Sequence, residues 1–211
     1  MKKKLDILLS DISRTKISDL VIQIISVTIG VFLGFVISNW SQNSRESNKQ
    51  NLLIKNIEAE INSNKNKVES RIDYHIAVRD SSRNFLMKND SNQTKLHFFK
   101  GVNTVTFDNS AYQTGIQTGL FNTMDFDIIQ SINEIYTKQR SYEDFANLIL
   151  AGLIKMDTDN NSYSERKLAN FLSISMTDLV IKEKELSRIY NKTLNLIDEY
   201  KSVDNWVPRR G

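Results

Sequence analysis

The strongest constraint on this chain is a run of twenty-one residues, Leu20 to Trp40, that contains no charged side chain. Its sequence is LVIQIISVTIGVFLGFVISNW, with five uncharged polar residues: Gln23, Ser26, Thr28, Ser38 and Asn39. As an α-helix the run would be about 30 Å long, which is the thickness of a bilayer's hydrocarbon core. A helix that is apolar on every face needs an apolar environment on every face. The run therefore predicts a transmembrane helix over residues 20–40.

Two other interpretations of the run remain open beside a retained anchor. The start Lys2-Lys3-Lys4 is also typical of a secretory signal peptide, and Val36-Ile37-Ser38 is an imperfect cleavage site. The apolar part of a signal peptide is usually about 7 to 15 residues, however, and this run is longer. A core helix of a soluble protein would need more apolar material around it than the short, polar remainder of the chain provides. We therefore favour the anchor.

The flanks of the run predict its orientation. Five basic residues precede it and three follow it within the next twenty positions: Lys2, Lys3, Lys4, Arg14 and Lys16, then Arg45, Lys49 and Lys55. Because cytoplasmic flanks carry the excess of Lys and Arg, residues 1–19 are predicted to be a short basic cytoplasmic tail. That tail is either solvated or lies along the inner membrane surface through its apolar residues. The part of the chain after the run is then extracytoplasmic, which the absence of cysteine permits.

Small residues recur at every fourth position of the run. Ser26, Gly30, Gly34 and Ser38 therefore share one helix face. Such a face lets two helix backbones approach closely in a membrane, and it predicts a homo-oligomer. The alternative is that the stripe reflects only the frequency of glycine and serine in membrane helices.

Residues 41–211 carry the periodicity of amphipathic helices, and the predicted fold class is all-α. The transmembrane helix is expected to continue into a long helix and then into an antiparallel helical bundle that forms the ectodomain. The expected elements are a long helix over about 43–88, an irregular part over 89–109, and helices over 110–121, 125–139, 141–156 and 163–201. The polar stretch 62–67 is a possible break in the long helix. The irregular part is either a small hairpin or a loop that tucks aromatic residues under the helices.

The most distinctive soluble stretch is SAYQTGIQTGLF, residues 110–121. Its two glycines, Gly115 and Gly119, would each cost a helix about 1 kcal/mol relative to alanine. Close packing of helices, with Gly119 as a C-cap, explains them without a function. The sharper alternative is a polar interaction site that includes Tyr112, Gly115 and Gly119.

The sequence predicts no catalytic, cofactor-binding or metal-binding residues. It has no cysteine and two histidines, which excludes the usual structural zinc sites, and we expect His75 to be a partly exposed helical residue. Residues 157–161 imitate the start of a calcium loop, but Ser162 and Leu168 replace the required glycine and glutamate. The carboxylates of Glu58 and Glu60, and of Glu183 and Glu185, are two residues apart and point to different helix faces. A net charge of +3 gives no electrostatic signature of nucleic-acid binding.

Four short motifs resemble those of a known group of proteins. They are Ile37-Ser38-Asn39-Trp40 at the end of the run, Ala111 to Gly119, Met124-Asp125-Phe126-Asp127, and Tyr136 with Gln139. Together they resemble a family of uncharacterised single-span bacterial membrane proteins with a helical soluble domain. The resemblance covers the run and residues 43–145, and it implies a location in the bacterial inner membrane. It implies no activity and no functional residues.

Two functional hypotheses follow. The first is a non-enzymatic, membrane-anchored helical scaffold or interaction protein that self-associates and binds an unknown envelope protein. The second is a membrane-anchored helical bundle that senses a ligand in a pocket near Gly115 and Gly119 and signals through a partner. The enzyme interpretation ranks third, because no catalytic motif is present.

Overall fold

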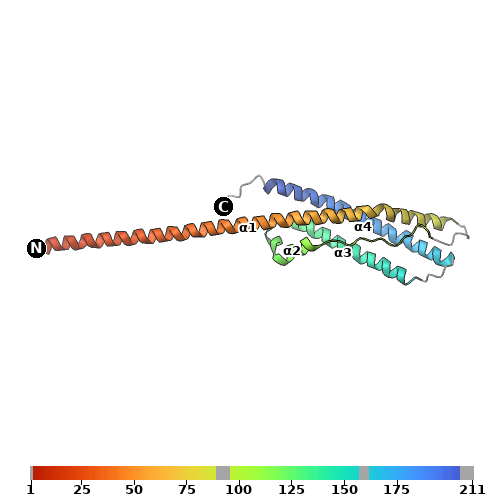
Figure 1. Ribbon diagram of the computed structural model, residues 1–211, viewed down its shortest axis with the longest axis horizontal. Helices are drawn as coiled ribbons and strands as arrows, with labels where there is room; N and C mark the ends of the chain where they lie inside the picture. Colours follow the sequence, from red (N-terminus) through yellow and green to blue (C-terminus); the bar gives the residue numbers. More distant parts are fainter. Residues whose placement is uncertain (1, 89–95, 157–161, 205–211) are drawn as a thin grey trace. The chain divides into compact units, whose positions relative to one another are not determined.

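The computed structural model describes residues 2–88, 96–156 and 162–204, with the backbone alone at 2–18, 162, 203 and 204. These residues form four α-helices and one 3₁₀ helix, and they contain no strand, so the predicted all-α class is confirmed. The elements are α1 (Lys2–Met87), α2 (Ser110–Thr118), η1 (Leu120–Thr123), α3 (Phe126–Ile154) and α4 (Ser162–Asp204), as Figure 1 shows. The chain divides into two compact units, and the boundary falls inside α1, between Lys49 and Gln50.

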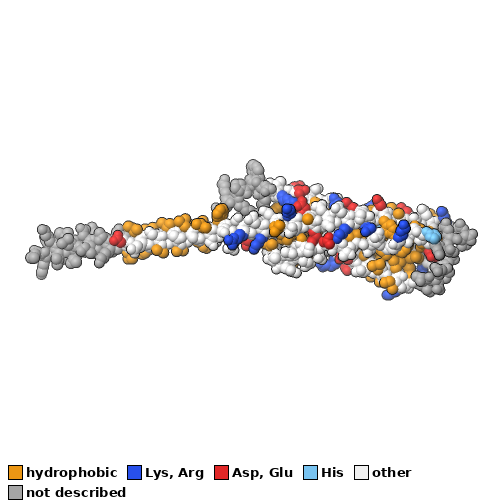
Figure 2. All heavy atoms as spheres, in the orientation of Figure 1, with side chains coloured by type: hydrophobic (Ala, Val, Ile, Leu, Met, Phe, Trp, Pro, Cys, Tyr) orange, Lys and Arg blue, Asp and Glu red, His pale blue; other side chains and the backbone are white. Residues whose placement is uncertain are grey.

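The first unit contains the apolar run. From Leu20 to Trp40 every side chain on α1 is exposed, and Figure 2 shows the hydrophobic ones along the helix surface. Within the described residues this is the one helix long and apolar enough to cross a membrane, judged by length and composition. The most apolar window has a mean hydropathy of 2.6, and none of it is buried against other parts of the chain.

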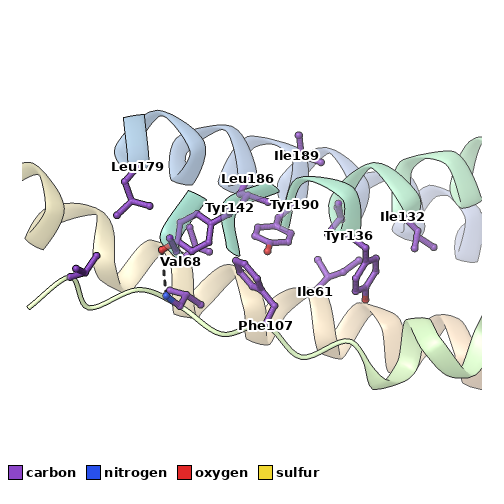
Figure 3. Packing of buried hydrophobic residues seen from close by; sticks show 14 of the residues in the cluster. Ile61, Val68, Phe107, Ile132, Tyr136, Tyr142, Leu179, Leu186, Ile189 and Tyr190 are labelled. Carbon is purple, nitrogen blue, oxygen red and sulfur yellow. Dashed lines mark hydrogen bonds between the residues drawn. The ribbon is translucent and has the colours of Figure 1, made fainter. Parts of the chain in front are cut away.

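The second unit has a core built from α1, α3, α4 and the segments between them. On α1 the buried residues follow seven-residue steps: Ile54, Ile61, Val68, His75 and Ser82. A second row on the same side contains Gln50, Ile57, Asn64 and Val78. Two such rows form the narrow stripe by which long helices pack against each other. Figure 3 shows the aromatic part of this core, in which Tyr136, Tyr142 and Tyr190 point into the space between the helices.

Hydrogen bonds between side chains fix the directions of the helices in this unit. Along α4, Glu183 contacts His75 and Thr177 contacts Arg83, so residue numbers fall on α4 as they rise on α1. Between α3 and α4, Ser131 pairs with Thr193, while Lys138 donates to Glu185 at 2.7 Å. Helix α4 is therefore antiparallel to both α1 and α3.

An extended segment, residues 99–109, allows α1 and α3 to run in the same direction, and we call it the strap. It returns along α1 without forming a helix, so side chains of the neighbouring helices must satisfy its backbone. Asn64 does so twice, donating to the Asp108 carbonyl at 2.7 Å and accepting from the Asp108 N–H at 2.9 Å. At the other end, Tyr74 donates to the Gly101 carbonyl at 2.6 Å. Of the two predicted forms of residues 89–109, the described part is a loop with Phe107 tucked into the core, and it contains no hairpin.

Several predicted helix boundaries are wrong. Residues 125–139 and 141–156 form one helix, α3, because the Ser141 hydroxyl accepts from Lys182 and caps nothing, while Tyr142 is fully buried. The actual N-cap is Asp125, whose carboxylate accepts from the N–H groups of Asp127 and Ile128. The helix predicted over 110–121 ends at Thr118. Residues 62–67 do not break α1, since Asn64 lies in the core and binds the strap.

Candidate functional site

The predicted interaction residues lie on and around α2, and two of the three are held by contacts inside the domain. The Tyr112 ring stacks on the Tyr136 ring, with centroids 3.9 Å apart and planes 11° apart. Its hydroxyl donates to Asn133 at 2.8 Å. Tyr112 therefore fastens α2 to α3, and its ring is half-buried.

The two glycines have separate structural roles. A Cβ atom on Gly115 would lie 2.6 Å from the Phe121 ring and 3.0 Å from Leu53, so this position is a close approach between α2, η1 and α1. Gly119 adopts a φ of +69° as the C-cap of α2, a conformation that glycine adopts without strain. Both observations fit the packing interpretation of this stretch. Gly115 cannot line a ligand pocket, because the Phe121 ring fills the space beside it.

Glu60 is the centre of a buried polar cluster at the N-terminus of α2. Its carboxylate accepts from the N–H of Ala111 at 2.8 Å and of Tyr112 at 3.4 Å, from the Ser110 hydroxyl at 3.2 Å, and from the Tyr136 hydroxyl. A carboxylate is stabilised there because the first N–H groups of a helix have no partner within the helix and carry partial positive charge. Burial, together with the hydrogen bond to Glu60, raises the pKa of Tyr136 well above its ordinary value. The cluster is thus a complete structural joint between α1, α2 and α3.

A second buried cluster joins α1, α3, α4 and the strap. His75 contacts Glu183 through Nδ1 at 2.8 Å and the Val102 carbonyl through Nε2 at 2.7 Å. Tyr142 donates to the same oxygen of Glu183 at 3.1 Å, and it accepts from the Val105 N–H at 3.4 Å, the bond drawn dashed in Figure 3. Burial is the main cause that raises the pKa of Tyr142, and the neighbouring Glu183 carboxylate adds to it.

The geometry of this cluster determines where its protons lie. A carbonyl oxygen can only accept, so Nε2 of His75 carries a proton. One further proton lies between Nδ1 and the Glu183 oxygen, on one atom or the other. His75, Tyr142 and Glu183 have no exposed surface, so the cluster presents no group to a substrate from solution. Its chemistry is that of a buried polar lock.

The prediction that His75 is partly exposed is wrong, because its ring is fully buried. The signal for its burial was present in the sequence: His75 lies seven residues after Val68 and fourteen after Ile61. The same spacing places Asn64 seven residues after Ile57. The carboxylate pairs were separated correctly, since Glu58 pairs with Lys201 and Glu185 with Lys138 on the outside, while Glu60 and Glu183 are buried. The sequence analysis missed the role of the two buried members.

An apolar groove of about 440 Å³ lies on the outside of the domain, between the C-terminal part of α3 and the N-terminal part of α4. Figure 2 shows hydrophobic side chains gathered over the C-terminal part of α3. Its lining residues are Phe145, Leu148, Ile149, Met156, Lys167, Asn170, Phe171, Ile174, Ser175 and Asp178. Gly152 deepens the packing there, because a Cβ atom on it would lie 2.8 Å from Phe171. Leu148 and Ile174 remain 69% and 59% exposed, which is unusual for large apolar side chains on neighbouring helices.

The predicted membrane-packing residues lie on the exposed part of α1. At Gly30 and Gly34 a Cβ atom would meet no atom within 4 Å, so the face of Ser26, Gly30, Gly34 and Ser38 is open in one copy of the chain. The calcium-like stretch 157–161 lies outside the described residues. Where the structure describes the chain, no group of three or more His, Cys, Asp or Glu side chains is arranged to hold a metal ion.

Comparisons with protein-family models, with curated proteins and with solved structures found no match to this chain. The resemblance to single-span bacterial membrane proteins therefore stays a prediction.

Proposed function

We propose that this chain is a non-enzymatic, single-span protein of the bacterial inner membrane whose helical-bundle ectodomain binds partners as a scaffold. One observation carries the proposal: the side chains of Leu20 to Trp40 are exposed on every face of α1. In water such a surface is strongly unfavourable, whereas a bilayer of about 30 Å accommodates it. The excess of basic residues before the run supports a cytoplasmic N-terminus.

Self-association through Ser26, Gly30, Gly34 and Ser38 is part of the proposal. The support is that this face is open and that no side chain fills the space beside the glycines. Two copies could bring their backbones together there and gain van der Waals contacts. Leucine at positions 30 and 34 would prevent that approach without adding polarity.

The ligand-sensing hypothesis has less support. Its expected pocket near Gly115 and Gly119 is occupied by the Phe121 ring on the Gly115 side. The groove between α3 and α4 is open along its length and has exposed apolar side chains, which suits a macromolecular contact better than an enclosed ligand.

The proposal is tested by one experiment on the tagged full-length protein in native bacterial membranes. Crosslinking and affinity capture identify the bound proteins, and protease protection shows on which side the C-terminus lies. We expect an extracytoplasmic C-terminus, capture of an envelope protein, and self-capture that the Gly30→Leu/Gly34→Leu variant reduces. Protein released by carbonate washing, or a C-terminus protected inside the cytoplasm, would overturn the topology.

A further inference from the structure

We propose that the groove between α3 and α4 binds the same groove of a second copy of this chain, with the two α4 helices antiparallel across a two-fold axis. This interface extends the proposed self-association to a second surface, separate from the face of Ser26, Gly30, Gly34 and Ser38. The evidence lies in the order of the residues by which α4 lines the groove.

Six residues of α4 line the groove, at positions that share one helix face: Lys167, Asn170, Phe171, Ile174, Ser175 and Asp178. These positions are symmetric about the midpoint between Leu172 and Ser173. In an antiparallel pair of α4 helices centred on that midpoint, position 167 faces position 178 of the second copy. Position 170 then faces 175, and position 171 faces 174.

The chemistry of these six residues has the same symmetry as their positions. Lys167 would face Asp178, a cation opposite an anion. Asn170 would face Ser175, and Phe171 would face Ile174. A two-fold interface brings one patch against itself, so each residue must be complementary to the residue at the mirrored position. All three pairs meet this requirement, and each occurs twice in the dimer.

The surroundings of the groove favour the same occupant. Neither Lys167 nor Asp178 takes part in an ion pair within the described part of the chain, so both are available to a second copy. The positions from 167 to 178 extend about 16 Å along α4, which is three helical turns. Leu148, from α3, lies beside this row and adds an exposed apolar side chain to the patch.

A parallel arrangement of two copies would not have this complementarity. It would place Lys167 against Lys167 and Asp178 against Asp178, and like charges in direct contact oppose association. A helix from an unrelated protein would need no mirrored order of charges on α4. The mirrored order therefore favours a second copy in the antiparallel arrangement.

The test uses single-cysteine variants of the full-length protein in detergent micelles, since the chain has no cysteine of its own. Lys167→Cys and Asp178→Cys carry different tags, and both are made in the Gly30→Leu/Gly34→Leu background to remove association through the apolar run. With a short bismaleimide crosslinker we expect a mixed product of the two variants, and little product from either variant alone. A product from Lys167→Cys alone would show a parallel arrangement and overturn the proposal, as would the absence of any product.

Charge exchange gives a second, independent measurement. Lys167→Glu and Asp178→Lys should each weaken dimerisation about tenfold, because two symmetry-related pairs become repulsive at once. The double variant Lys167→Glu/Asp178→Lys should restore wild-type dimerisation. Lys192→Glu is the matched control, since Lys192 is an exposed α4 residue whose ion pair with Glu134 lies outside the groove. If the double variant dimerises no better than the single ones, the antiparallel pairing is wrong, whatever the capture experiments show about membrane topology.

Discussion

One helix, α1, has two parts with opposite surroundings. Between Leu20 and Trp40 its apolar residues face outward on every side. Between Gln50 and Met87 they form a narrow stripe, and the other faces carry charged and polar residues. The secondary structure is the same in both parts, so the backbone does not distinguish them. The difference lies in what must surround each part: an apolar solvent for the first, and two helices and a strap for the second.

The largest expected effects come from placing a charge in each part. Ile61→Asp buries a carboxylate without a partner, and it should destabilise the helical domain by about 4 kcal/mol or more. Phe32→Asp should leave the unfolding of that domain unchanged, but it should cost about 3 kcal/mol at the centre of a bilayer and reduce membrane retention. Circular dichroism on heating measures the first effect, and carbonate extraction measures the second.

The control for this pair is Leu52→Asp, at a residue of α1 that is 60% exposed in the second unit. It should change neither measurement. Full membrane retention of Phe32→Asp would contradict the assignment of residues 20–40 to a bilayer.

Within the second part of α1, the buried pair of His75 and Glu183 is expected to give the next largest effect. His75→Leu leaves the Glu183 carboxylate buried without its main partner, which should cost about 3 to 5 kcal/mol in urea unfolding. The double variant His75→Leu/Glu183→Leu removes both polar groups and should be clearly more stable than His75→Leu alone. Equal loss in the two variants would mean that the ring's packing matters and the pairing does not.

Glycine to alanine substitutions sharpen the comparison with a smaller effect. Gly115→Ala places a methyl group 2.6 Å from Phe121, and the resulting repacking should cost about 1 to 3 kcal/mol. Gly30→Ala meets no atom within 4 Å and should favour the helix by up to about 1 kcal/mol. Thermal unfolding of both full-length variants checks the signs. A neutral Gly115→Ala would show that η1 can move away from α2.

The smallest expected effect is a dependence on alkaline pH that only the second unit should show. Because the folded pKa of Tyr136 is raised above the unfolded value of about 10, its contribution to stability is present below pH 10. Above that pH the unfolded chain binds fewer protons than the folded one, so the free energy of unfolding falls as pH rises. Tyr136→Phe should make this fall shallower in urea titrations at pH 9 to 11. An unchanged slope would assign the fall to Tyr142 and Tyr190, whose pKa values are also raised.

Patterns of single residues predicted much of the fold. The helical periodicity predicted the all-α class, the long first and last helices, and the loop that tucks Phe107 into the core. The predicted break at Ser141 was wrong because a capping motif competes with burial of the residues beside it, and here Tyr142 is core. The exposure of His75 was misjudged because its residue type was given more weight than its position seven residues after Val68.

The sequence by itself determined the properties that depend on local order: the uncharged run at 20–40, the small residues on one face of it, and the helices with their apolar stripes. Only the tertiary structure decided which polar residues are buried, because the partners are far apart in the chain. Glu60 meets Tyr136, and His75 meets Glu183, only once α1, α3 and α4 are packed together. The mirrored order of residues from Lys167 to Asp178 was always present in the sequence. It gained a meaning when the structure placed all six around one exposed groove, since symmetry matters only for residues that share a surface.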